Sequence, residues 1–240
     1  MDSRTINAGE LFCALHADHI HHAISRGASS ILCSPEASLQ NYGVPVLITA
    51  QLRKAISEVS AAFYDYPSKK IALYGVTGTN GKSSTAGFIH QLLTHLGHRS
   101  FIISGAWRDS LFSDTDSPIL STPEAPMLHK LLHGYADAGC THGSIEITSH
   151  ALSERNCRCA DVVLSGAVYT AMGRDHLDFH PTIEAYHQVK CSMISQCRPG
   201  SPVILDAASP LVPLLPPGVN TRLLGKDIRM ISSHSDCAVL

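Results

Sequence analysis

The sequence predicts an α/β protein with a mostly parallel sheet and helices on both faces. Strand-like apolar runs alternate with helix-like segments along the chain, and the continuous apolar run 69–78 leads directly into a glycine turn and a helix. The chain has 240 residues, of which 44% are hydrophobic and 16% charged. This composition permits a buried core in one large domain or two small ones and argues against disorder.

The first part of the chain predicts a small α/β domain. Short strands are expected at 9–15, 28–34 and 44–49, and helix-like segments at 18–27 and 51–67. Gly27 ends the first helix and Pro67 stops the second. We therefore place a domain boundary at Pro67–Ser68, which gives domains 1–68 and 69–240.

The second domain continues the same alternation. The expected order is strand 69–78, helix 83–97, strand 99–105, helix 123–139, strands 142–149 and 160–170, helix 182–197 and strand 201–207. Gly97 and Gly139 close two of these helices. Such βα units form a parallel sheet, and ligands of open α/β sheets bind at the carboxyl ends of the strands.

Charge and composition exclude several classes of function. A net charge of −2 and a pI near 6.7 give no general attraction to nucleic acid or to anionic membranes. No apolar run is long enough to span a bilayer, and "MDSRTINAGE" lacks the basic-then-apolar pattern of a signal peptide. We expect a cytoplasmic protein without nucleic-acid or membrane partners.

Cysteines and histidines give little indication of a metal centre. The eight cysteines are scattered through apolar segments, which favours reduced thiols over a disulfide framework. Cys157 and Cys159 are separated by one residue and not by the two usual in zinc knuckles, so zinc is the less favoured alternative there. The histidines of "HADHIHH" (16–22) are interpreted as a solvated helix face, with a metal site as the alternative.

The stretch "YGVTGTNGKSS" (74–84) predicts a phosphate-binding loop. A strand, a glycine turn and Gly-Lys-Ser at a helix start direct backbone N–H groups and the helix dipole at an anion. Lys82 can reach the outer phosphates and the Ser83 hydroxyl can bind Mg²⁺. Position 76 is valine, which departs from the standard G-x4-G-K-[ST] spacing. The expected nucleotide contacts are Gly78, Thr79, Asn80, Gly81, Lys82, Ser83 and Ser84.

This variant loop resembles the ATP loop of the Mur ligases, the ATP-dependent amide ligases that build the peptide of peptidoglycan. Further segments resemble the family, and its MurE branch most, in the same order along the chain: "DSR" (2–4), "STPEAPMLHKLL" (121–132), "IEITSHAL" (145–152) and "RDHLDFHPTIEAYHQVK" (174–190). The resemblance runs from residue 2 to about 205. It implies a P-loop central ATP-binding domain at 69–240, preceded by a small truncated uridine-nucleotide-binding domain at 1–68.

The resemblance implies a MurE-like ligase that adds diaminopimelate or lysine to UDP-N-acetylmuramoyl-alanyl-glutamate through an acyl phosphate, with ATP and Mg²⁺ as cofactors. A third domain completes the site in this family, and its "DNPR" motif does not occur in the sequence. We therefore expect the C-terminal ligase domain to be absent from this chain or supplied by a separate polypeptide. One alternative is a catalytically incomplete relative that binds nucleotide and acts by sequestration or with a partner; another is an unrelated P-loop kinase or NTPase.

The family pattern implies a catalytic set of Lys82, Glu146, His176 and Lys190. It also implies that Ser83, Glu146, His176 and Lys190 surround Mg²⁺, with Lys190 carbamylated to N6-carboxylysine. Carbamylation needs a neutral amine, which burial of a lysine favours by lowering its pKa. Lys190 is the only charged residue between Glu184 and Arg198, which predicts an inward-facing side chain. His176 and His180 have the spacing of a zinc pair, but no "HExxH" arrangement is present.

The same pattern implies a substrate-binding set of Ser3, Ser121, Thr122, Thr148, Glu154 and Arg158. The segment after "HAL" departs from the family, so the arginine that matches the family's position is either Arg155 or Arg158. Ala171 also stands where the family has an asparagine near the nucleotide.

Overall fold

Two units make up the part of the chain that the computed structural model describes, namely residues 1–38, 41–106, 120–228, 232–234 and 237–239. The units are Met1–Val59 and Ser60–Leu240. Helix α2 (Leu52–Phe63) crosses the division, which lies ahead of the boundary expected at Pro67–Ser68. The helix predicted to stop at Pro67 ends earlier, at Phe63, because Asp65 and Tyr66 adopt left-handed backbone angles, and Pro67 instead starts the short 3-10 helix Pro67–Lys69 inside the second unit.

The first unit is built on a three-stranded parallel sheet, and its helices include the first part of α2. Its strands β1 (Leu11–Ala14), β2 (Ser30–Cys33) and β3 (Val46–Ile48) lie in that order, and α1 (Ile20–Ser25) connects the first two. Phe12, Ile20 and Ile31 are fully buried in its core. His16, His19, His21 and His22 are exposed, which confirms the predicted solvated face.

The second unit is built on a six-stranded sheet in which every pair is parallel, and this confirms the predicted fold class. The strand order is β5-β6-β4-β7-β8-β9. The strands are β4 (Ala72–Thr77), β5 (Ser100–Ile103), β6 (His142–Glu146), β7 (Gly166–Tyr169), β8 (Val203–Asp206) and β9 (Thr221–Leu224). The helices are α3 (Lys82–His95), α4 (Ala125–Asp137), α5 (Ser149–Leu152) and α6 (Ile183–Cys191). β10 (Ser232–His234) and β11 (Cys237–Val239) form a separate antiparallel pair.

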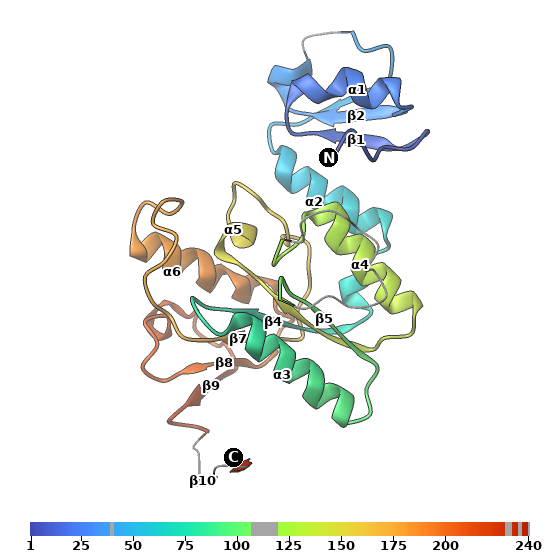
Figure 1. Ribbon diagram of the computed structural model, residues 1–240. Helices are drawn as coiled ribbons and strands as arrows, with labels where there is room; N and C mark the ends of the chain where they lie inside the picture. The colour runs from blue at the N-terminus through green and yellow to red at the C-terminus, as the bar shows by residue number, and fades with distance from the viewer. Residues whose placement is uncertain (39–40, 107–119, 229–231, 235–236, 240) are drawn as a thin grey trace. The chain divides into compact units, whose positions relative to one another are not determined.

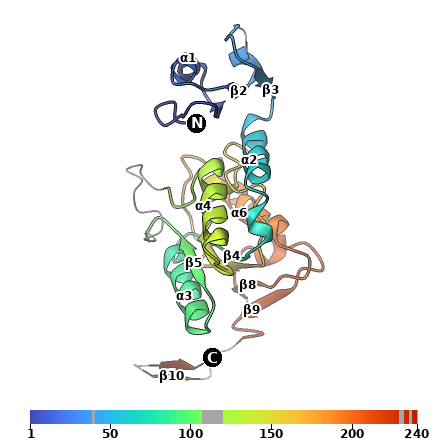
Figure 2. The same ribbon diagram turned by 90° about the vertical axis from the view of Figure 1, so that its right-hand side faces the viewer.

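Helices cover both faces of this sheet (Figure 1; Figure 2). On one face, Val76 and Ile102 pack with Ala86 of α3. On the other face, Phe101 packs in a larger core with Leu128 of α4. Adjacent residues of β5 thus serve opposite faces, as the two-residue period of a strand requires. The arrangement leaves the carboxyl ends of β4, β5 and β6 at one edge, where the predicted site residues follow.

Several elements differ from the sequence prediction, among them the helix predicted at 182–197, which ends at Cys191 and continues as a 3-10 helix to Gln196. The strand predicted at 160–170 is shorter, because the chain turns at 158–161 and pairs continuously only from Gly166 to Tyr169. The strand predicted at 142–149 ends at Glu146, and the short helix α5 follows because the Thr148 side chain accepts a hydrogen bond from the Ala151 N–H and caps it. The edge strand β9 was not predicted.

No helix in the described part of the chain is long and apolar enough to cross a membrane. The seven cysteines whose side chains are described are free thiols, in agreement with the prediction of reduced cysteines.

Candidate nucleotide-binding site

The predicted phosphate loop joins the end of β4 at Thr77 to the start of α3 at Lys82. Gly78 has φ +152° and Gly81 has φ +83°, a backbone region that side chains disfavour. A Cβ atom on Gly78 would lie 1.9 Å from Thr170 Oγ1, so the loop can approach Thr170 only with glycine at this position. The two glycines therefore fix the shape of the turn that the sequence predicted.

The segment after β7 holds the loop in place. Thr170 Oγ1 donates a hydrogen bond to the Asn80 carbonyl at 2.6 Å. The Thr79 N–H donates to the Ala171 carbonyl at 2.8 Å, and the Gly173 N–H donates to Thr79 Oγ1 at 2.9 Å. Each contact joins residues about ninety positions apart in sequence, which a reading of the loop alone does not reveal. Hydrogen bonds with residues 170–173 therefore hold the loop in position.

The solvent side of the loop carries the groups that can meet an anion. Asn80, Gly81 and Ser84 are exposed, whereas Lys82 and Ser83 are half-buried. Lys82 Nζ donates to the Thr79 carbonyl at 2.9 Å, which holds the ammonium group beside the loop. The first turn of α3 adds the partial positive charge of a helix N-terminus.

Glu146 ends β6 next to this helix and is 4% exposed. Its Oε2 atom accepts hydrogen bonds from Ser83 Oγ and from Ser104 Oγ, both at 2.7 Å. The predicted pair of Ser83 and Glu146 is therefore in direct contact. Ser104 was not predicted, although it directly follows β5 at the same edge of the sheet. A carboxylate and two hydroxyls form an all-oxygen set of the kind that Mg²⁺ prefers.

Lys190 lies on α6 and is 1% exposed, which confirms the predicted inward-facing side chain. Its Nζ atom donates to the Gly78 carbonyl at 2.8 Å and lies 3.4 Å from Thr77 Oγ1. Among the described residues, no carboxylate forms an ion pair with it. Burial, and to a smaller extent the positive charge of Lys82, lowers the pKa of Lys190 from 10.5 to about 7. A substantial neutral fraction is therefore present near neutral pH.

His176 occupies a different part of the site. It has a left-handed backbone (φ +52°), and its Nε2 atom lies 3.5 Å from Asp175 Oδ2. Its ring meets the His150 ring edge-on, with centroids 4.7 Å apart, and lies 6.4 Å from the Tyr186 ring. Within the described chain, His176 makes no hydrogen bond or ion pair with Ser83, Glu146 or Lys190, and no three His, Cys, Asp or Glu residues are grouped to hold a metal ion.

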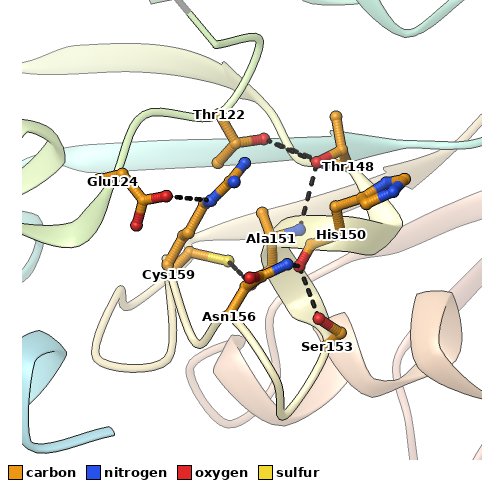
Figure 3. Close-up of polar contacts among 9 residues, drawn as sticks. Thr122, Glu124, Thr148, His150, Ala151, Ser153, Asn156 and Cys159 are labelled. Atoms are coloured by element: carbon orange, nitrogen blue, oxygen red, sulfur yellow. Dashed lines mark hydrogen bonds and ion pairs between the residues drawn. The ribbon is translucent and has the colours of Figure 1, made fainter. Parts of the chain in front are cut away.

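The predicted substrate residues Thr122 and Thr148 lie side by side (Figure 3), next to the end of β6 at Glu146. Thr122 Oγ1 donates to the Glu146 carbonyl at 2.9 Å and accepts the Thr148 N–H at 3.0 Å. Nearby, Arg158 Nε donates to Glu124 Oε1 at 3.0 Å in a largely buried ion pair. Thr122 and Thr148 thus place two hydroxyls at the end of β6, and Arg158 is tied to Glu124 at the start of α4.

The other predicted substrate residues are more scattered. Glu154 and Arg155 are exposed, and the Arg155 guanidinium lies 5.5 Å from the Phe179 ring centre. Of the two candidate arginines, Arg158 is the one that pairs with Glu124, two residues after Thr122. Ser121 is half-buried next to Thr122. Ser3 belongs to the first unit, where it is buried and its Oγ atom lies 2.9 Å from His22 Nδ1.

Comparison with known proteins gives the family context of this site. A family model described as "Mur ligase middle domain" matches residues 76–216, which is more than half of the chain. Two similar curated proteins are named UDP-N-acetylmuramoyl-L-alanyl-D-glutamate–2,6-diaminopimelate ligase. The one from Chelativorans sp. (strain BNC1) is 37% identical over 216 residues, and the one from Rhizobium meliloti (strain 1021) is 36% identical over 214 residues. These matches cover 87% and 86% of this chain but 44% and 43% of those proteins, so the chain spans less than half their length.

Solved structures show the same fold. The structure of a UDP-N-acetylmuramoyl-L-alanyl-D-glutamate–2,6-diaminopimelate ligase superposes with a TM-score of 0.75 at 21% identity, over 93% of this chain and 47% of that one. The MurF ligase from Thermotoga maritima in complex with ADP superposes with a TM-score of 0.64 at 17% identity, over 93% of this chain and 49% of that one. At 21% and 17% sequence identity, these superpositions show a shared fold and nothing further.

Proposed function

Because the chain belongs to the Mur ligase family, we propose that loop 78–84 binds ATP and that the chain takes part in MurE-like amide ligation during peptidoglycan synthesis. The substrates are UDP-N-acetylmuramoyl-alanyl-glutamate and an amino acid, either diaminopimelate or lysine. The single observation that supports this best is the meeting of Lys82, Ser83, Glu146 and Lys190 around one glycine turn. The printed names of the similar curated proteins support the substrate class.

The residues of the loop suit the transfer of a phosphoryl group. Formation of an amide from a carboxylate requires activation, here by attack of the substrate carboxylate on the γ-phosphate of ATP to give an acyl phosphate and ADP. Such a transfer depends on positioning and on neutralising charge. Lys82 and the N-terminus of α3 supply positive charge, and Gly78, Thr79, Asn80, Gly81 and Ser84 shape the turn around the phosphates.

The oxygen atoms around Glu146 fit a magnesium ion. Ser83 and Glu146 are the residues that would hold it, and the position of Ser104 adds a third oxygen to the set. Mg²⁺ would supply charge neutralisation on the transferred phosphate. His176 and Lys190 are added to the proposed ligand set by the family resemblance. Lys190 has the buried, partly neutral amine that carbamylation by CO₂ needs, so we assign it as the candidate N6-carboxylysine.

The remaining predicted residues would bind the other parts of the substrate. Ser121, Thr122 and Thr148 offer hydroxyls beside Glu146, and Glu154 with Arg158 would meet the dipeptide arm. Ser3 and the first part of the chain, residues 1–68, would hold the uridine nucleotide, and residues 69–240 would form the central ATP-binding domain. Since ATP and the nucleotide-linked dipeptide are cytoplasmic metabolites, the proposed place of action is the cytoplasm.

The test is phosphate release that depends on the dipeptide nucleotide. The purified chain is incubated with ATP, Mg²⁺ and UDP-N-acetylmuramoyl-alanyl-glutamate, with diaminopimelate, lysine or neither, and both phosphate and product mass are followed. We expect the dipeptide nucleotide to stimulate phosphate release, and Glu146→Gln to abolish the stimulation. ATP binding without stimulation would contradict ligation and support the alternative of a nucleotide-binding protein that acts by sequestration or with a partner.

A further inference from the structure

Two residues of α6, one helical turn apart, both contact the phosphate loop. The Tyr186 hydroxyl lies 3.0 Å from Thr79 Oγ1, and Lys190 Nζ donates to the Gly78 carbonyl at 2.8 Å. Residues four apart lie on the same face of a helix. Both side chains are fully buried, and Lys190 Nζ lies 4.8 Å from the centre of the Tyr186 ring. The helix therefore holds two successive loop residues, Gly78 and Thr79.

Thr79 is tied to the protein through all of its polar atoms. Its N–H donates a hydrogen bond to the Ala171 carbonyl, and its carbonyl accepts one from Lys82 Nζ. Its Oγ1 atom accepts a hydrogen bond from the Gly173 N–H and forms another with the Tyr186 hydroxyl. Because Thr79 also carries the acceptor for Lys82, its position determines where that ammonium group lies. The Tyr186 hydroxyl is thus linked through Thr79 to the side chain that is expected to contact phosphate.

We propose that Tyr186 is a positioning residue for the nucleotide site: through the hydrogen bond to Thr79, it keeps the loop and Lys82 in the arrangement that binds the phosphates of a nucleotide. The inference rests on the proposed function, because it assigns Tyr186 a role in the same site. It also gives Thr79 the role of an anchor between α6, the 171–173 segment and Lys82. Burial raises the pKa of Tyr186, so its hydroxyl keeps its proton and remains available for this bond at neutral pH.

The experiment measures ATP·Mg²⁺ affinity by calorimetry in the full chain and in Tyr186→Phe, Thr79→Val, the double variant and Thr79→Ser. Loss of one net hydrogen bond is expected to weaken ATP binding about two- to tenfold in Tyr186→Phe. Thr79→Val removes the other partner of the same bond, so the double variant should bind no more weakly than Thr79→Val alone. Thr79→Ser keeps the hydroxyl and should bind like the wild type.

The matched control is Tyr169→Phe, which removes another buried tyrosine hydroxyl whose partner is the Cys191 carbonyl and not the loop. It should leave ATP affinity unchanged. Equal ATP affinity in Tyr186→Phe and Tyr169→Phe, or effects that multiply in the double variant, would overturn the proposal and leave Tyr186 with a role in packing only.

A second measurement needs no nucleotide. Hydrogen exchange of the Thr79 amide, which is bonded to the Ala171 carbonyl, should be faster in Tyr186→Phe than in the wild type and unchanged in Tyr169→Phe. If the exchange rate of the Thr79 amide is unchanged in Tyr186→Phe, the Tyr186 hydroxyl does not hold Thr79 in place and the proposal is wrong. Failure of the wild type to bind ATP would instead count against the proposed function, so the two failures are distinguishable.

Discussion

Replacing Lys190 with methionine is expected to raise the free energy of unfolding by about 1–4 kcal/mol at about pH 6 and to abolish the proposed phosphate release that depends on the dipeptide nucleotide. Lys190 is 1% exposed, and within the described residues no carboxylate forms an ion pair with it. A buried charge without a counter-ion is costly, whereas methionine fills a similar volume without charge. The lysine would therefore serve function at the expense of stability. Denaturant unfolding across pH, in buffers purged of CO₂, measures the difference.

The sign of the pH dependence follows from the lowered pKa of Lys190, about 7 in the folded chain against an ordinary 10.5. Below about pH 7 the amine is charged in both states, so the folded state bears the full cost of the buried charge. Between about 7 and 10.5 only the unfolded chain keeps the proton, so the stability of the wild type rises with pH through this window. The advantage of Lys190→Met should therefore shrink as pH rises towards 10.5.

Lys130 provides the control, because it is an exposed lysine on α4. Lys130→Met should show no such pH-dependent gain. If Lys190→Met is no more stable than the wild type at any pH, or if its advantage grows with pH, the account of Lys190 as a buried amine with a lowered pKa is wrong. Added bicarbonate should add the mass of one CO₂ to the wild type and not to the methionine variant.

Lys82→Ala should weaken ATP binding about tenfold to a hundredfold, because a charge-assisted contact with phosphate contributes roughly 1.5–3 kcal/mol. Lys82 Nζ is held beside the loop by the Thr79 carbonyl and has no other hydrogen-bond partner in the described part of the chain. Competition against a fluorescent ATP analogue measures the affinity, with Lys130→Ala as the control for loss of a positive charge. If Lys82→Ala binds ATP as tightly as the wild type does, Lys82 does not contact the phosphates.

The elements nearest the site were predictable because local sequence dictates them. The apolar run 69–78 is typical of a buried strand and contains β4, and the positive φ angles at positions 78 and 81 favour glycine. Lys190 was predicted to face inward because it stands alone among uncharged residues, and its burial in the structure confirms this prediction. The helix start at Lys82 followed from Gly-Lys-Ser after a turn.

Two contacts between distant segments, Ser104 with Glu146 and Tyr186 with Thr79, were not predicted. Ser104 reaches Glu146 only because β5 and β6 are neighbours in the sheet, and Tyr186 reaches Thr79 only because α6 packs beside the loop. Helix α5 was missed because "IEITS" continues an apolar alternation, and only the hydrogen bond at Thr148 ends the strand pattern there. Strand β9 is partly exposed and lies at the sheet edge, so its sequence lacks a clear apolar run.

The central claim is that this glycine turn, with Ser83 and Glu146 beside it, binds ATP together with Mg²⁺. The most direct measurement is calorimetric titration of the chain with ATP, performed with Mg²⁺ and again with Mg²⁺ removed by a chelator. We predict saturable ATP binding that is stronger with Mg²⁺ and that loses this dependence in Ser83→Ala and Glu146→Gln. Absence of ATP binding at millimolar nucleotide, or binding that is the same with and without Mg²⁺ in the wild type, would contradict the account.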